Sequence, residues 1–214
     1  MTRFKNLIKE VNNIVITTHI YPDADGIGSQ VALGLALKKL DKNVVCVNES
    51  PLVERYDYLN TKDIIISASQ YRQKSRQTID LLIVMDTHSL DRLGSNMRKM
   101  AQEAERTFFI DHHPCPEELK DKHCIDTSYA ATGELVGALI EEIGIPLDIQ
   151  MALPLYISIL IDTNSFRYPT VSSKTHRFIA KLIDIGIKPH TAYNSIYGNK
   201  NPTYFKLVGK LLSS

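Results

Sequence analysis

The 214-residue sequence is poor in cysteine and lacks long hydrophobic runs. Its three cysteines, Cys46, Cys115 and Cys124, form no CxxC pair, and their odd number argues against a disulfide framework. The longest apolar runs, such as Leu81–Met85, are far too short to cross a bilayer. The N-terminal segment also lacks the apolar stretch of a secretory signal. We therefore expect a cytoplasmic protein with no membrane partner.

The sequence also lacks an excess of either charge. Lysine and arginine total 25 and aspartate and glutamate total 24, so the formal net charge is only +1. Proteins that clamp long nucleic acids usually carry a basic excess, because neutralising phosphates supplies most of their affinity. If the substrate carries phosphates, we expect it to be small or short, and not a long duplex.

Apolar strands alternate with helical patterns in the first half of the chain. A nearly all-apolar helix is expected over residues 27–40, and a helix without that apolar character over residues 96–104. The continuous apolar run before Asp86 is typical of a parallel strand that is covered on both faces. The pattern predicts an α/β fold, with a doubly wound, mainly parallel five-stranded sheet flanked by helices. The five expected strands are residues 14–18, 44–47, 63–67, 80–86 and 107–110.

The second half is expected to be helical. The first of its helices opens at Thr132, and Gly144 and Pro146 end it. The last segment is amphipathic and reaches Ser214 with no stop signal. The expected helices are residues 132–143, 149–162, 173–185 and 204–212.

Residues 18–28 place one imidazole and two carboxylates in a tight turn between a strand and a helix. These side chains belong to His19, Asp23 and Asp25. Carboxylates this close repel one another unless a cation lies among them, so one interpretation is a site for a divalent metal ion. The alternative is an aspartate-rich turn whose side chains only cap the following helix.

Acids and histidines follow two further strands. Asp86 follows the fourth strand, and Asp111, His112 and His113 follow the fifth. In open α/β sheets, ligands bind in the crevice outside the carboxyl ends of the strands. Asp162 ends an apolar helix, where the helix dipole disfavours an acid unless a cation compensates it. These placements favour the metal interpretation.

Four ordered motifs carry a family resemblance: Asp23-Ala24-Asp25-Gly26, Asp86-Thr87-His88, Asp111-His112-His113 and Asp162-Thr163. Together they resemble the motifs of the DHH phosphoesterase superfamily over nearly the whole chain. Residues 86–94 and 162–168 are most similar to its branch of nanoRNases and pAp phosphatases. The resemblance implies a hydrolase that acts on short oligoribonucleotides, on 3′-phosphoadenosine 5′-phosphate, or on both.

The resemblance also implies two divalent metal ions, usually manganese. Four carboxylates would nearly neutralise two such ions, and a mixed oxygen and imidazole set favours manganese, cobalt or iron. A water activated by the two ions would then attack phosphorus. The implied ligands are His19, Asp23 and Asp86 for one ion and Asp25, Asp86, His112 and Asp162 for the other, with Asp86 bridging.

Other residues of the motifs are expected to act beside the ligands. His113 would face the scissile phosphate as a donor or an acid, although a structural role is an equal alternative. Asp111 is expected to orient a ligand imidazole, and we group it with Asp86 and His113 as catalytic. Arg92 and Arg167 are candidates to bind phosphate oxygens, although surface or ion-pair roles are at least as plausible. The remaining histidines are expected to be ordinary: His88, His123, His176 and His190.

Two departures from the family pattern affect these expectations. Members of this branch often have glycine where Asn164 stands. The family also joins this domain, through a linker helix, to a smaller C-terminal domain with a glycine-rich and histidine motif, and no such motif precedes Ser214. We expect residues 1–195 to form the catalytic, metal-binding DHH domain. Residues 196–214 would begin the linker helix toward a substrate-binding domain that this chain lacks.

Other functions of the same superfamily stay open. They are a manganese-dependent inorganic pyrophosphatase and a cyclic dinucleotide phosphodiesterase, although the latter usually carries sensory and membrane segments that the sequence lacks. A nucleotide-binding module without catalysis is a further alternative. A homodimer is also left open.

Overall fold

The computed structural model describes residues 2–59, 64–74, 77–198 and 202–213. Its centre is a parallel six-stranded sheet with the order β3-β2-β1-β4-β5-β6. The strands are β1 (Asn13–Thr18), β2 (Asn43–Asn48), β3 (Ile65–Ser67), β4 (Leu81–Met85), β5 (Thr107–Asp111) and β6 (Cys124–Ile125). The predicted α/β fold with a parallel sheet is confirmed. The sixth strand, β6, was not expected, and the predicted start of the third strand at residue 63 lies outside the described residues.

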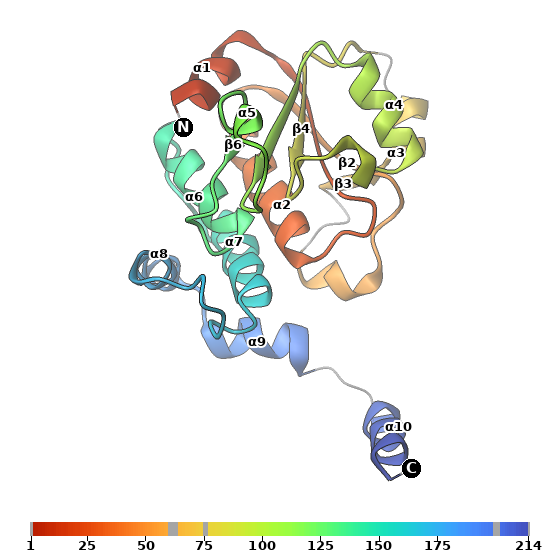
Figure 1. Ribbon diagram of the computed structural model, residues 1–214, viewed down its shortest axis with the longest axis vertical. Coiled ribbons are helices and arrows are strands. Elements are labelled where there is room, and N and C mark those ends of the chain that lie inside the picture. Colours follow the sequence, from red (N-terminus) through yellow and green to blue (C-terminus); the bar gives the residue numbers. More distant parts are fainter. Residues whose placement is uncertain (1, 60–63, 75–76, 199–201, 214) are drawn as a thin grey trace.

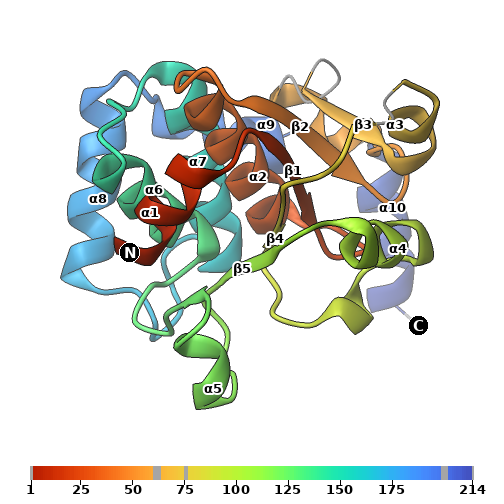
Figure 2. The same ribbon diagram turned by 90° about the horizontal axis from the view of Figure 1, so that it is seen from above.

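Helices cover both faces of the sheet (Figures 1 and 2). One face carries α1 (Thr2–Glu10), α2 (Ala24–Lys38), α6 (Thr132–Glu142) and α7 (Ile149–Asp162). The other face carries α3 (Ala68–Lys74) and α4 (Ser95–Glu103). The short α5 (Glu117–Lys120) lies between β5 and β6 in the sequence.

The side chains of the central strands alternate between these two layers. In β4, Leu81, Ile83 and Met85 pack with the α2, α6 and α7 layer. Leu82 and Val84 point to the α3 and α4 layer. Successive side chains of a strand point to opposite faces, so a strand covered on both sides needs an unbroken apolar run. The run before Asp86 has this property because β4 lies in the middle of the sheet.

The order of the strands creates a crevice at the carboxyl edge of the sheet. The central strand β1 lies between β2 and β4. The chain therefore leaves β1 toward one side of the sheet and later returns to the other side at β4. Ligands of open α/β folds bind at such a switch point. The segments that leave β1 and β4 are those with His19 and Asp86.

Helices α2 and α7 approach each other very closely at Gly28. A Cβ atom on Gly28 would lie 2.4 Å from the carbonyl oxygen of Pro154 and 3.1 Å from Cβ of Ser158. The first of these neighbours is backbone and has no rotamer through which to move away. The missing side chain thus lets α7 pack against the helix that carries Asp25.

The C-terminal part is helical, as predicted. It comprises α8 (Ser173–Asp184), α9 (Pro189–Tyr197) and α10 (Pro202–Leu212). Helix α10 has no buried residue and lies away from the sheet in Figure 1. The predicted domain boundary at residues 195/196 falls within α9, and the division stays a prediction. Among the described residues, no helix has both the length and the apolar character to cross a membrane.

We predict that Gly28→Ala destabilises the protein by overpacking the contact between α2 and α7. The expected loss is about 1–3 kcal/mol in the free energy of unfolding, measured by urea denaturation. Gly209→Ala is the matched control, because no atom lies within 4 Å of the Cβ position at Gly209 in α10. The control should leave stability unchanged or slightly raised. Equal stability of Gly28→Ala and the wild type would contradict the close approach.

Candidate metal centre

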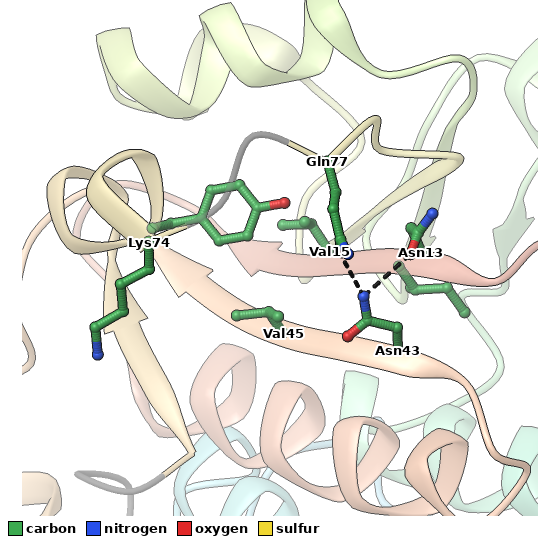
Figure 3. Close-up of a pocket in the computed structure, with 8 residues that line it drawn as sticks. Asn13, Val15, Asn43, Val45, Lys74 and Gln77 are labelled. Atoms are coloured by element: carbon green, nitrogen blue, oxygen red, sulfur yellow. Dashed lines mark hydrogen bonds between the residues drawn. The ribbon is translucent and has the colours of Figure 1, made fainter.

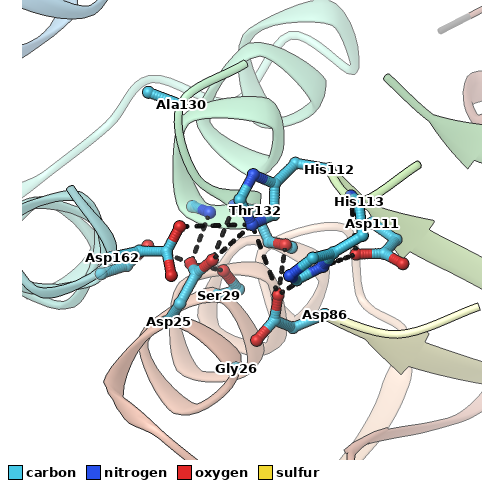
Figure 4. Close-up of polar contacts among 12 residues, drawn as sticks. Asp25, Gly26, Ser29, Asp86, Asp111, His112, His113, Ala130, Thr132 and Asp162 are labelled. Atoms are coloured by element: carbon cyan, nitrogen blue, oxygen red, sulfur yellow. Dashed lines mark hydrogen bonds and ion pairs between the residues drawn. The ribbon is translucent and has the colours of Figure 1, made fainter. Parts of the chain in front are cut away.

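The predicted acidic and histidine side chains gather at the carboxyl edge of the sheet. Figure 4 shows those of Asp25, Asp86, Asp111, His112, His113 and Asp162. They come from the turn after β1, the start of α2, the ends of β4 and β5, and the end of α7. Three groups have potential ligand atoms within 4.8 Å of one another: His19, Asp23 and Asp86; Asp25, His112 and Asp162; and Asp86, His112 and His113. The structure therefore brings all six predicted ligands together.

Asp23 caps α2 with one carboxylate oxygen and faces His19 with the other. Its Oδ1 caps α2 by accepting hydrogen bonds from the backbone N–H groups of Asp25, at 3.0 Å, and Gly26, at 3.1 Å. Its Oδ2 lies 3.9 Å from Nε2 of His19. The cap explains why α2 starts at Ala24, earlier than the predicted residue 27. One oxygen of Asp23 is left for the metal centre.

Asp25 is fully buried between α2, α6 and α7. Its Oδ2 accepts a hydrogen bond from the N–H of Thr132 at 2.8 Å, and its Oδ1 accepts one from the N–H of Gly133 at 3.0 Å. The hydroxyl of Ser158 also donates to Oδ1, at 2.5 Å. The N-terminus of α6 favours a negative charge through its free N–H groups and its dipole. These contacts hold the carboxylate with Oδ2 3.7 Å from Nε2 of His112.

Asp86 lies at the centre of the cluster. Its Oδ2 lies 3.6 Å from Nε2 of His19. Its Oδ1 lies 3.8 Å from Nε2 of His112 and 3.7 Å from Nδ1 of His113. Thr132 donates a hydrogen bond from its hydroxyl to Oδ1 at 2.9 Å. The backbone φ of Asp86 is +59°, in the left-handed region that aspartate and asparagine tolerate better than most residues. Among the predicted carboxylate ligands, Asp86 is the one that faces the imidazoles of both predicted histidine ligands, His19 and His112.

The surroundings of Asp86 make its charged form unfavourable in the absence of a cation. Burial raises the pKa of Asp86 well above its usual range, and the negative charges of Asp25 and Asp23 raise it further. The hydrogen bond from Thr132 opposes this shift without reversing it. A divalent cation would remove the cost of the buried charge.

Two imidazole nitrogens in the cluster are buried without a hydrogen-bond partner in the described part of the chain. They are Nε2 of His19 and Nε2 of His112. Each faces carboxylate oxygens across 3.3–3.9 Å, which is too long for a good hydrogen bond. Burial lowers the pKa of His19, which favours the neutral imidazole that binds metals. Unpartnered imidazole nitrogens that face several carboxylates fit divalent metal ions.

Asp162 ends α7, and its Oδ2 lies 3.3 Å from Nε2 of His112. Burial and the charge of Asp25 raise the pKa of Asp162 to about 6. The backbone φ of Asn164 is +49°, in the left-handed region. Glycine and asparagine are the residues that adopt this region most readily, so asparagine suits the backbone that this chain has at residue 164.

Asp111 holds two imidazoles, and neither of them belongs to a predicted metal ligand. Its Oδ1 lies 2.7 Å from Nδ1 of His113, and its Oδ2 lies 2.7 Å from Nδ1 of His88. Burial alone would raise the pKa of Asp111, but the hydrogen bonds with His113 and His88 lower it to about 2. The same hydrogen bond raises the pKa of His113. Asp111 thus positions His113 and His88, whereas the predicted ligand His112 is not its partner.

The sequence interpretation missed two residues of the cluster. His88 was taken for an ordinary histidine, although its place two residues after Asp86 puts it near the centre. Thr132 was taken only as the start of a helix, yet it contacts both Asp25 and Asp86. Its distance of 46 residues from Asp86 leaves no local signal in the sequence.

The two candidate phosphate-binding arginines differ in their surroundings. Arg92 ends the 3₁₀ helix η3 (Leu90–Arg92), and its carbonyl accepts a hydrogen bond from the N–H of Ile20 at 2.9 Å. Within the described ranges its guanidinium makes no ion pair, and it lies near enough to His19 to help lower the pKa of that imidazole. Arg167 donates to the backbone and side-chain oxygens of Asn164, at 2.8 and 2.6 Å. Arg92 therefore lies beside the centre with a free charge, whereas Arg167 is held by Asn164.

A cavity of about 290 Å³ lies at the opposite edge of the sheet, near the amino ends of β1 and β2 (Figure 3). There the side chain of Asn43 donates hydrogen bonds to the side-chain oxygens of Asn13, at 3.0 Å, and Gln77, at 2.7 Å. Among the described residues that line this cavity there is neither an acid nor a histidine, in contrast to the cluster at the carboxyl edge.

Comparison with known proteins agrees with the four motifs. The sequence matches the DHH family, N-terminal domain, over residues 13–159. It is 28% identical over 204 residues to the bifunctional oligoribonuclease and PAP phosphatase NrnA of Thermus thermophilus, covering 94% of this chain and 58% of that protein. The NrnA of Bacillus subtilis is 25% identical over 206 residues, covering 93% of this chain and 61% of that protein.

The crystal structure of an exopolyphosphatase-related protein from Bacteroides fragilis has the same fold. It superposes with a TM-score of 0.89 at 25% identity, covering 100% of this chain and 64% of that one. The chain thus spans about three fifths of the length of these relatives. The predicted resemblance is confirmed: this chain belongs to the DHH family, whose N-terminal domain it matches over most of its length.

Proposed function

We propose that this chain is the metal-binding part of a phosphoesterase that hydrolyses short oligoribonucleotides, 3′-phosphoadenosine 5′-phosphate, or both. The proposal depends mainly on one observation: two buried, unpartnered imidazole nitrogens face a cluster of four carboxylates at the switch point of the sheet. The names of the NrnA relatives support this substrate class. We also propose that residues 1–195 form this domain and that the segment after it leads to a second, substrate-binding domain.

Two divalent ions would occupy the centre: the donor set suits manganese, cobalt or iron, and the family resemblance implies manganese among these. When bound, they would supply positive charge to the phosphoryl oxygens and lower the pKa of the attacking water. The proposed ligands are His19, Asp23 and Asp86 for one ion and Asp25, Asp86, His112 and Asp162 for the other.

His113 is the proposed acid, or hydrogen-bond donor, toward the substrate. Its side chain is 43% exposed at the mouth of the cluster, and Asp111 holds its Nδ1. The raised pKa of His113 favours the protonated ring, whose Nε2 remains available to a phosphate or leaving-group oxygen. Arg92 would add a second positive charge for phosphate oxygens.

We predict that manganese activates hydrolysis of pApA and of 3′-phosphoadenosine 5′-phosphate. Product release should rise with added Mn²⁺, stop in excess chelator and return when Mn²⁺ is restored. Pyrophosphate and a cyclic dinucleotide, tested in parallel, distinguish the other activities of the superfamily. If nucleotides bind but none of these substrates is hydrolysed under any metal condition, the chain is a binding module and the proposal is wrong.

We predict that Asp86→Asn abolishes loading of both ions without unfolding the chain. Asparagine has the same shape as aspartate and tolerates the positive φ, and its carbonyl still accepts the hydrogen bond from Thr132. Metal content is measured by elemental analysis. Asp91→Asn is the control, because the side chain of Asp91 is 89% exposed outside the cluster. Two ions per chain in Asp86→Asn would contradict the bridging role.

The same variant should be no less stable than the wild type when both are metal-free. Because the pKa of Asp86 is raised in the folded protein, the wild type loses stability as the pH rises from about 4, where the unfolded carboxyl ionises, through that raised pKa. Asparagine does not ionise and avoids this loss. The free energies of unfolding of both proteins are measured by urea denaturation at neutral pH in chelator. If Asp86→Asn is much less stable than the wild type, the buried charge of Asp86 does not destabilise the metal-free protein.

We predict that His113→Ala lowers kcat about 100- to 10,000-fold, the usual contribution of a general acid, and leaves the metal content unchanged. His19→Ala is the matched comparison, because it removes an imidazole that is a proposed ligand. That variant should lose both activity and one ion. Loss of metal from His113→Ala would show instead that His113 is a ligand.

A further inference from the structure

A second cavity adjoins the metal centre at the same edge of the sheet. Its walls are residues 20–22, which connect His19 to Asp23, together with Asn48, which ends β2, and residues 50–53, which come after β2. Tyr56 of the 3₁₀ helix η1 (Glu54–Leu59) completes it. Its volume is about 380 Å³, within the range of small-molecule sites, roughly 300–1,000 Å³. The proposed ligands His19 and Asp23 stand at the two ends of the first wall, which places the cavity beside the centre.

Hydrogen bonds fix the wall between the two ligands. The hydroxyl of the buried Tyr56 donates to the carbonyl of Pro22 at 2.9 Å. The N–H of Ile20 donates to the carbonyl of Arg92 at 2.9 Å. The first contact ties the turn to the segment after β2, and the second ties it to the segment after β4. The cavity is therefore formed before any ligand binds.

The lining combines an exposed aromatic ring with apolar surface. Tyr21 is 83% exposed and Val53 is 56% exposed. Pro22, Pro51 and Leu52 contribute further apolar surface. Exposed aromatic rings beside a phosphate site are the usual platforms on which proteins stack nucleobases.

One polar side chain in the lining has an unused donor. Asn48 ends β2 and is only 2% exposed. Its Oδ1 accepts a hydrogen bond from the side chain of Gln30 at 3.0 Å. Its Nδ2 is buried without a partner among the described residues. Buried polar groups without partners are rare, and a ligand in the cavity would supply an acceptor for this one.

We propose that this cavity is the subsite for a nucleobase of the substrate whose phosphate lies at the metal centre. Tyr21 provides the stacking surface, and Asn48 donates a hydrogen bond to an acceptor on the edge of the base. The inference rests on the proposed function and deepens it. With such a subsite the centre favours phosphoesters of nucleosides over pyrophosphate and polyphosphate, which have no base to stack.

Fluorescence tests the subsite without hydrolysis. The sequence contains no tryptophan, so Tyr21→Trp introduces a single indole at the stacking position. In the presence of Mg²⁺, adenosine 5′-monophosphate should change the emission of this indole saturably. Ribose 5-phosphate, which has the same phosphate but no base, should leave the emission unchanged. Equal responses to the two ligands, or none to either, would overturn the subsite.

Kinetics test the same residue. Tyr21→Ala should raise KM for pApA about 5- to 100-fold, the loss expected for one stacked base, with little change in kcat. Tyr21→Phe keeps the ring and should behave as the wild type does. Tyr193→Ala is the control for loss of an exposed tyrosine elsewhere, since Tyr193 is 46% exposed on α9. An unchanged KM in Tyr21→Ala would overturn the subsite.

The two tests separate this inference from the function on which it rests. Hydrolysis of pApA together with an unchanged KM in Tyr21→Ala would leave the phosphoesterase in place and overturn the subsite. A base-dependent signal from Tyr21→Trp in a chain that hydrolyses none of the phosphoesters would support the subsite and overturn the proposed hydrolysis.

Discussion

Mutual repulsion among buried carboxylates is the constraint around which this fold is arranged. The protein itself compensates two of these charges: backbone N–H groups of α6 hold Asp25, and His88 and His113 hold Asp111. Asp86 and Asp162 receive no comparable compensation, and the pKa values of both are raised. The carboxylates thus differ in how far the polypeptide itself stabilises their charge. Asp86 and Asp162, which it stabilises least, lie beside the two imidazole nitrogens that have no partner among the described residues.

The topology of the sheet makes this arrangement possible. Parallel strands bring the segments after β1, β4 and β5 to a single edge, and the change of direction at β1 opens the crevice between them. Helices complete the centre from one side of the sheet. Because Gly28 lets α7 approach α2, Ser158 reaches Asp25, and the end of α7 brings Asp162 toward His112. The packing of α2 against α7 therefore helps to set the distances among the proposed ligands.

Much of this could be predicted from the sequence, because the signals were local. The apolar runs predict five of the six strands, and acids and histidines directly after those runs predict the position of the centre. Strand β6 has only two residues, too few for a periodic signal. Contacts such as Thr132 with Asp86 join segments far apart in the sequence. The hydrogen bonds of Asp111 with His88 and His113 depend on how the side chains at the end of β5 are oriented, and residue spacing does not specify that orientation.

Exposure within the cluster is uneven among the proposed ligands. The side chains of Asp25 and Asp86 are almost wholly enclosed, whereas those of Asp23 and Asp162 are 52% and 29% exposed. Each proposed ion position thus has one carboxylate open to water, and these two carboxylates belong to different positions. Two ions bound as proposed would each have a separate route to solvent, so that one could exchange while the other stayed bound. The half-loaded centre would then be a distinct state, whose population would follow the metal concentration around the protein.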